Sequence, residues 1–166
     1  MSIGTGIMTV CSQPGTSSMA KRILPPVWLF LTILLMKTLD KYLPLINLYG
    51  EPWVYIGLAP LVVGLIIAAW SATLFHRAKT GVVPFSETTT IVTGGMYRFT
   101  RNPMYLGMVL VLLGVGILFG SLTPFLLIPV FAWIIQTVFI LEEEKILEAQ
   151  FGDEYLAFKQ QVRRWI

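Results

Sequence analysis

The sequence predicts an all-α protein, a polytopic membrane helix bundle with about four transmembrane helices and C-terminal amphipathic helices. Of its 166 residues, 55% are hydrophobic and only 13% are charged, and the mean hydropathy is +0.74. Soluble domains carry about 25% charged residues, so this composition indicates an integral membrane protein. The charges are also clustered, because ten of them lie within residues 142–166 and leave long uncharged stretches elsewhere.

The chain divides into a predicted flexible tail, residues 1–22, and a single membrane domain, residues 23–166. The tail is rich in Ser, Thr and Gly and shows no hydrophobic period. It contains the single cysteine, Cys11, so the sequence predicts neither an internal disulfide nor a metal site. Lys21 and Arg22 precede an apolar segment that lacks a small-residue cleavage site, so we expect a retained first span.

The spans follow from the uncharged stretches and from bilayer thickness. Residues 103–141 carry no charge, and as one helix they would be about 58 Å long, twice a bilayer core of about 30 Å. We therefore expect them to fold back near Gly120 and Pro124. The four predicted spans are residues 23–46, 53–75, 103–119 and 122–141, and cytoplasmic helices follow over residues 142–166.

Two sequence patterns predict how the spans pack and face. Gly57, Gly64 and Ser71 recur every seven residues in the second span, which favours close approach of another helix. Ten of the twelve Lys and Arg residues fall on one side of the four-span arrangement. Both termini and the middle loop are therefore predicted to be cytoplasmic, at a prokaryotic inner membrane or the endoplasmic reticulum. The sequence contains no basic run interleaved with aromatic residues, so it does not predict nucleic-acid binding.

Two polar clusters on the predicted cytoplasmic side indicate a binding site. The first, residues 97–107, opens the third span, where Asn102 is suited to cap the helix and Pro103 to begin it. The second is the run of glutamates at 142–144, which ends the fourth span. Because these spans form a hairpin, the clusters should be neighbours. The helix N-terminus and arginines suit a carboxylate, and the glutamates suit an ammonium group or ribose hydroxyls.

Several short motifs occur in a fixed order from residue 93 to the C-terminus. Thr-Gly-Gly-Met-Tyr at 93–97 precedes Arg-Asn-Pro-Met-Tyr-Leu-Gly at 101–107, and paired glutamates follow at 142–143. Phe-Gly-Asp-Glu-Tyr at 151–155 and Val-Arg-Arg-Trp-Ile at 162–166 complete the set. This order resembles the isoprenylcysteine carboxyl methyltransferase and phospholipid methyltransferase superfamily over about residues 75–166.

The resemblance implies a methyltransferase that depends on S-adenosyl-L-methionine. The residues it implies for cofactor binding are Tyr97, Asn102, Pro103, Tyr105, Leu106, Gly107, Glu142 and Glu143. It implies that Arg101 and Arg164 contact an anionic group of the substrate, and Glu143 is the third candidate catalytic residue. Asn102 stands where eukaryotic carboxyl methyltransferases have histidine, and an amide cannot act as a general base.

The implied partners are the lipid bilayer and a lipophilic or prenylated substrate. The α-carboxylate of a prenylated cysteine is the first candidate acceptor, and a phospholipid amine or a small thiol are alternatives within the same chemistry. A membrane reductase using NADPH is a different class, disfavoured by the short chain. A transporter or scaffold is disfavoured because residues 103–141 offer few polar side chains at mid-membrane. A C-terminal helix bearing Tyr155, Phe158 and Trp165 should lie on the membrane or fold over the bundle.

Overall fold

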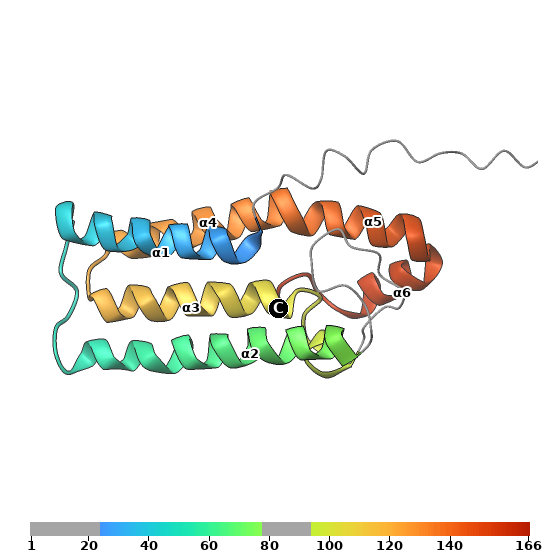
Figure 1. Ribbon diagram of the computed structural model, residues 1–166, viewed down its shortest axis with the longest axis horizontal. Helices are drawn as coiled ribbons and strands as arrows, with labels where there is room; N and C mark the ends of the chain where they lie inside the picture. The colour runs from blue at the N-terminus through green and yellow to red at the C-terminus, as the bar shows by residue number, and fades with distance from the viewer. Residues whose placement is uncertain (1–23, 78–93) are drawn as a thin grey trace, which may run out of the picture.

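The computed structural model describes residues 24–77 and 94–166, which form a bundle of helices (Figure 1). Within these ranges the regular structure is helical, apart from an isolated bridge between Asn47 and Ser121. The prediction of an all-α fold is therefore confirmed. The predicted flexible tail, residues 1–22, lies outside the described residues.

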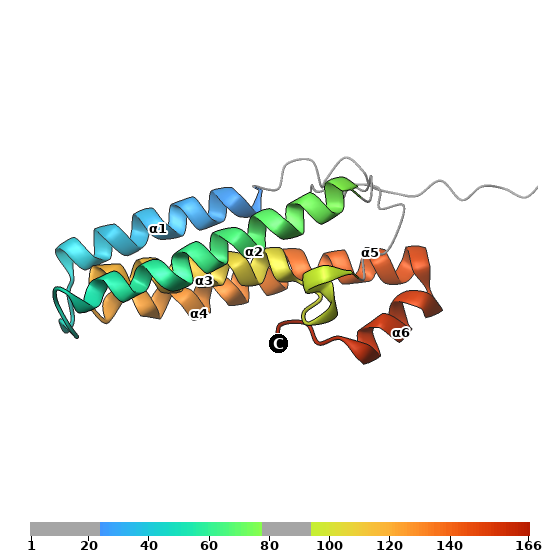
Figure 2. The same cartoon turned by 90° about the horizontal axis from the view of Figure 1, so that it is seen from below.

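Long helices lie side by side in the bundle, and two C-terminal helices continue beyond one end of it (Figures 1 and 2). The first half contains α1 (Pro25–Tyr42), a 3-10 turn η2 (Trp53–Gly57) and α2 (Leu58–Arg77). The second half contains η3 (Gly95–Arg98), α3 (Pro103–Phe119), η4 (Thr123–Leu126), α4 (Leu127–Ile135), the π-helical turn η5 (Gln136–Ile140), α5 (Leu141–Phe151) and α6 (Asp153–Gln161).

Two helical stretches among the described residues are long and apolar enough to cross a membrane, Trp53–Leu74 and Thr123–Phe151. Pro103–Phe119 is a shorter apolar helix, whose bounds match the predicted third span. The number of four spans stays a prediction. The predicted fourth span was expected to end at residue 141, but the helical rod continues through η5 and α5 to Phe151.

The first predicted span, residues 23–46, is helical only in part, because α1 ends at Tyr42. The following residues bind instead to the turn between α3 and α4. The Thr123 hydroxyl donates to the Leu43 carbonyl at 2.8 Å and accepts from the Leu45 N–H at 3.0 Å. The Ser121 hydroxyl donates to Asp40 near the end of α1. This polar network ties α1 to the hairpin of α3 and α4.

The buried core lies among α1, α3 and α4, and the outside of the bundle is also apolar. The core cluster comprises Met36, Tyr105, Met108, Leu112, Phe131, Ile135, Phe139 and Ile140. Large apolar side chains also point outward, including Phe30 (66% exposed), Trp53 (63%) and Trp133 (65%). So many exposed large apolar side chains are typical of a membrane-facing or partner-facing protein.

Glycines bring α2 and α3 into backbone contact, as the seven-residue stripe predicted. A Cβ atom built on Gly64 would lie 2.5 Å from the Gly107 carbonyl oxygen. A Cβ atom on Gly114 would lie 2.6 Å from the Gly57 carbonyl oxygen. No side chain fits at these crossings, so glycine at each of them sets the distance between the helices.

Replacing Gly114 by alanine should therefore force α2 and α3 apart. We expect Gly114→Ala to lower stability by about 2 kcal/mol, the usual cost of overpacking, seen as a lower thermal midpoint in detergent. Gly116→Ala is the matched control, because a Cβ atom there would meet its nearest neighbour, Met36 Cε, only at 3.5 Å. Equal midpoints for the two variants would contradict this account of the α2–α3 contact.

Candidate functional site

The start of α3 and the start of α5 meet at one end of the bundle, as the hairpin prediction required. The Tyr105 hydroxyl donates a 2.7 Å hydrogen bond to Glu143 Oε1. Arg101 Nη2 lies 3.3 Å from Glu144 Oε1. The structure therefore joins the motif at 97–107 to two of the three consecutive glutamates.

Glu144 is the centre of this arrangement, because its carboxylate holds two arginines. Arg164 binds it in bidentate fashion, with Nε 2.9 Å from Oε1 and Nη2 2.8 Å from Oε2. Arg101 approaches the same Oε1 atom. The side chains of Glu144 and Arg101 are 7% and 8% exposed, so this contact is shielded from solvent. The hydrogen bonds to Glu144 raise the pKa of the Arg164 guanidinium above its usual value.

Arg101 retains hydrogen-bonding capacity inside the protein. Its Nε and Nη1 atoms are buried and have no hydrogen-bond partner among the described residues. Burying N–H groups of a cation without an acceptor is costly, and such groups are rare in folded proteins. The guanidinium is thus suited to receive an anionic group from a ligand.

Three tyrosines lie in or beside the site. Tyr105 contacts Glu143, and Tyr97 is almost fully buried. Burial, and to a smaller extent the nearby carboxylate of Glu143, raise the pKa of Tyr97. On α6, burial raises the pKa of Tyr155 to about 12. Tyr97 and Tyr155 therefore stay protonated at neutral pH.

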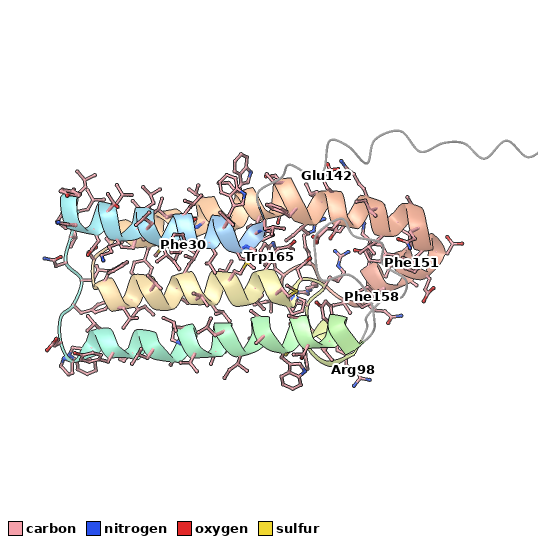
Figure 3. All side chains as sticks on the ribbon, in the orientation of Figure 1. Phe30, Arg98, Glu142, Phe151, Phe158 and Trp165 are labelled. Carbon is pink, nitrogen blue, oxygen red and sulfur yellow. The ribbon has the colours of Figure 1, made fainter. Side chains whose placement is uncertain are left out.

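The C-terminal segment folds back onto the start of α3, where the chain ends in both views (Figures 1 and 2). The Arg101 N–H donates to the Arg163 carbonyl at 3.0 Å. Trp165 packs against the core cluster, and its Nε1 donates to Gln136 Oε1 at 2.8 Å (Figure 3). The tail after α6 therefore returns to the bundle, whereas α6 itself lies beside α5 beyond the end of the bundle (Figures 1 and 2).

Asn102 occupies the N-cap position of α3, but its side chain does not cap the helix as predicted. Its amide instead donates to the carbonyl of Arg164 at 3.1 Å. Pro103 does begin α3, as predicted, and is buried. The Arg164 carbonyl on the C-terminal segment competes for the Asn102 side chain, which explains why the predicted cap is absent. No local helix signal in the sequence reveals this acceptor.

Not all of the predicted site residues join the cluster. Glu142 pairs with the exposed Lys145 at 3.0 Å, is itself 37% exposed, and lies on the side of α5 turned away from α3 (Figure 3). Consecutive helical residues point about 100° apart, so three adjacent glutamates cannot share one face. Gly107 faces Gly64 and Ala68 on α2, and Leu106 is half-buried. The cofactor roles of these residues stay predictions.

Three residues that hold this end of the bundle together were not among those given a catalytic or cofactor role from the sequence: Glu144, Thr100 and Gln136. Glu144 was visible only as one of three equivalent acids, and the π-helical turn before it alters the helical phase. Thr100 is 1% exposed and contacts the Arg164 carbonyl. These roles depend on the position of the C-terminal segment, so motif spacing alone carried no signal for them.

Comparison with known proteins identifies one family and two relatives. Residues 53–154, more than half of the chain, match the family described as phospholipid methyltransferase. An uncharacterized protein of Haemophilus influenzae is 41% identical over 63 residues, which are 38% of this chain and 100% of that protein. A protein-S-isoprenylcysteine O-methyltransferase of Schizosaccharomyces pombe is 33% identical over 72 residues, which are 43% of this chain but 30% of that enzyme. No solved structure matches the chain.

Removing the charge of Glu144 should loosen the whole cluster. We expect Glu144→Gln to destabilise the protein by about 3 kcal/mol, because two arginines would lose a shared buried partner. Glu142→Gln, one residue away, breaks only an exposed pair and should change stability by less than about 0.5 kcal/mol. Thermal unfolding of the two variants in the same detergent measures the difference, and equal destabilisation would be inconsistent with the geometry.

Proposed function

The chain belongs to the phospholipid methyltransferase family, and from that premise we propose that it transfers a methyl group from S-adenosylmethionine to a lipophilic acceptor. The observation that carries the proposal is the family match, which spans the Arg101 motif and the glutamates at 142–144. The family and two apolar helices together indicate a membrane protein. We extend this to the four-span arrangement with both termini and the site on the cytoplasmic side.

The side chains of the site fit this methyl donor. S-adenosylmethionine carries a carboxylate, an ammonium group and ribose hydroxyls. The unpartnered N–H groups of Arg101 suit a carboxylate, as does the start of α3, whose N-cap side chain is engaged elsewhere. The carboxylate of Glu143, held by Tyr105, suits an ammonium group or a hydroxyl.

When bound, the donor supplies an electrophilic methyl group on a sulfonium. An acceptor carboxylate forms the new C–O bond as the C–S bond breaks, giving a methyl ester and S-adenosylhomocysteine, and no proton moves. The protein must then hold the acceptor in line with the methyl group and exclude water. Arg101 is the proposed contact for the acceptor or donor carboxylate, since Arg164 is already bound through two nitrogens to Glu144.

The α-carboxylate of a prenylated cysteine is our first candidate acceptor. Its support is the name of the Schizosaccharomyces pombe relative and an arginine-rich site suited to an anion. The amine of a phospholipid is the second candidate, supported by the name of the family. An ammonium acceptor must first lose a proton, and Glu143 is the group proposed to accept it.

Methyl transfer by the purified protein in lipid nanodiscs tests the proposal. Radiolabelled S-adenosylmethionine is supplied with N-acetyl-S-farnesylcysteine, with phosphatidylethanolamine or with a small thiol. We expect a base-labile methyl ester on the prenylated cysteine, and base-stable label in the phospholipid would identify the second candidate. Failure to methylate any acceptor, together with calorimetric binding of NADPH instead of S-adenosylmethionine, would refute the proposal in favour of a reductase.

Arg101 gives the most specific mutational test of this site. Arg101→Gln removes the charge that we propose contacts an anionic group, and we expect kcat/KM to fall at least about 100-fold, equivalent to about 2.7 kcal/mol. Lys145→Gln is the control, because Lys145 is exposed and pairs only with the outward Glu142 among the described residues. A similar loss of activity in the two variants would count against Arg101 as a ligand contact.

A further inference from the structure

Two side chains of the motif converge on one backbone oxygen, the carbonyl of Arg164. The Thr100 hydroxyl donates to it at 3.1 Å, and the Asn102 amide donates to it at 3.1 Å. A carbonyl oxygen can only accept, so both side chains must act as donors here. The Thr100 hydroxyl also accepts the N–H of Asn102 at 3.1 Å, which fixes the two donors relative to each other.

The segment that carries this carbonyl has no regular structure of its own. It follows the end of α6 at Gln161, so no helical or sheet ladder fixes its backbone. The neighbouring Arg163 carbonyl accepts the N–H of Arg101 at 3.0 Å. Three consecutive residues of the motif thus hold two consecutive residues of the tail, and we call Thr100 and Asn102 the carbonyl clamp.

The clamp acts on a residue whose side chain is part of the site. The Arg164 guanidinium reaches Glu144 with two hydrogen bonds, and Glu144 also contacts Arg101. A bidentate pair needs the guanidinium plane to be placed accurately. Fixing the backbone of Arg164 from the motif side therefore fixes where its charge lies relative to Arg101.

We propose that Thr100 and Asn102 are positioning residues that act on methyl transfer through Arg164, an inference that rests on the proposed function. Asn102 then serves as a hydrogen-bond donor to the protein backbone. This role explains why an asparagine at a helix start leaves the helix uncapped.

Thr100→Val and Thr100→Ser form a matched pair, since valine keeps the shape and serine keeps the hydroxyl. We expect Thr100→Val to lower kcat/KM about five- to tenfold, the effect of one lost buried hydrogen bond, with Thr100→Ser close to wild type. In an Arg164→Lys background, where the bidentate pair is already lost, Thr100→Val should cost less than about twofold. Additive losses in that background, or equal losses for valine and serine, would overturn the proposal.

A second measurement does not depend on activity. Amide hydrogen exchange at Arg101, whose N–H donates to the Arg163 carbonyl of the tail, should be faster in Thr100→Val and in Asn102→Asp than in wild type, and unchanged in Thr100→Ser, measured on the intact protein in nanodiscs. Unchanged exchange in the first two variants would overturn the clamp, whatever the enzyme assays give. If exchange is faster in these variants but the protein transfers no methyl group, the hydrogen bonds of the clamp are supported. The proposed function and the catalytic role of the clamp are then refuted.

Discussion

The buried carboxylate of Glu144 is the interaction on which the candidate site depends. It binds Arg101 from the start of α3 and Arg164 from the C-terminal segment, so one side chain of α5 joins two distant parts of the sequence. Removing a single partner from such a cluster is more damaging than replacing the whole cluster, because a charge is left buried without compensation. Arg101 Nε and Nη1, which are buried and have no hydrogen-bond partner among the described residues, favour an anionic ligand.

The rest of the fold serves to place this carboxylate. At one end of the bundle, hydrogen bonds from the turn at Ser121 and Thr123 tie α1 to the hairpin of α3 and α4. Along the bundle, the Gly64 and Gly114 crossings hold α2 against α3. With both contacts fixed, α5 emerges beside the start of α3. The site is therefore a consequence of hairpin geometry.

The sequence was sufficient for the parts of the structure that depend on local pattern. The lengths of the uncharged apolar stretches predicted the helical class and the bounds of α3. The seven-residue spacing of small residues predicted the close contact between α2 and α3. The predicted hairpin of the third and fourth spans correctly placed the start of the third beside the glutamates, where Tyr105 contacts Glu143. Family resemblance added the chemistry that pattern alone could not supply.

Other features depend on contacts between distant segments and could not be predicted. Which of three adjacent glutamates faces the arginines depends on helical phase, and the π-helical turn at Gln136–Ile140 shifts that phase. Asn102 was expected to cap α3, but a carbonyl 62 residues away takes its amide. The helix α1 ends before residue 46, where the first span was predicted to end, and the residues after Tyr42 bind the turn at Thr123.

Photolabelling tests most directly whether one methyl-donor site is built from both segments. Ultraviolet irradiation of the protein with radiolabelled S-adenosylmethionine, followed by mass spectrometry, identifies the residues that carry the label. The arrangement around Glu144 predicts label on both the 97–107 motif and residues 143–165, displaced by excess S-adenosylhomocysteine and reduced in Glu144→Gln. Label confined to α1 or α2, or no displaceable label at all, would contradict it.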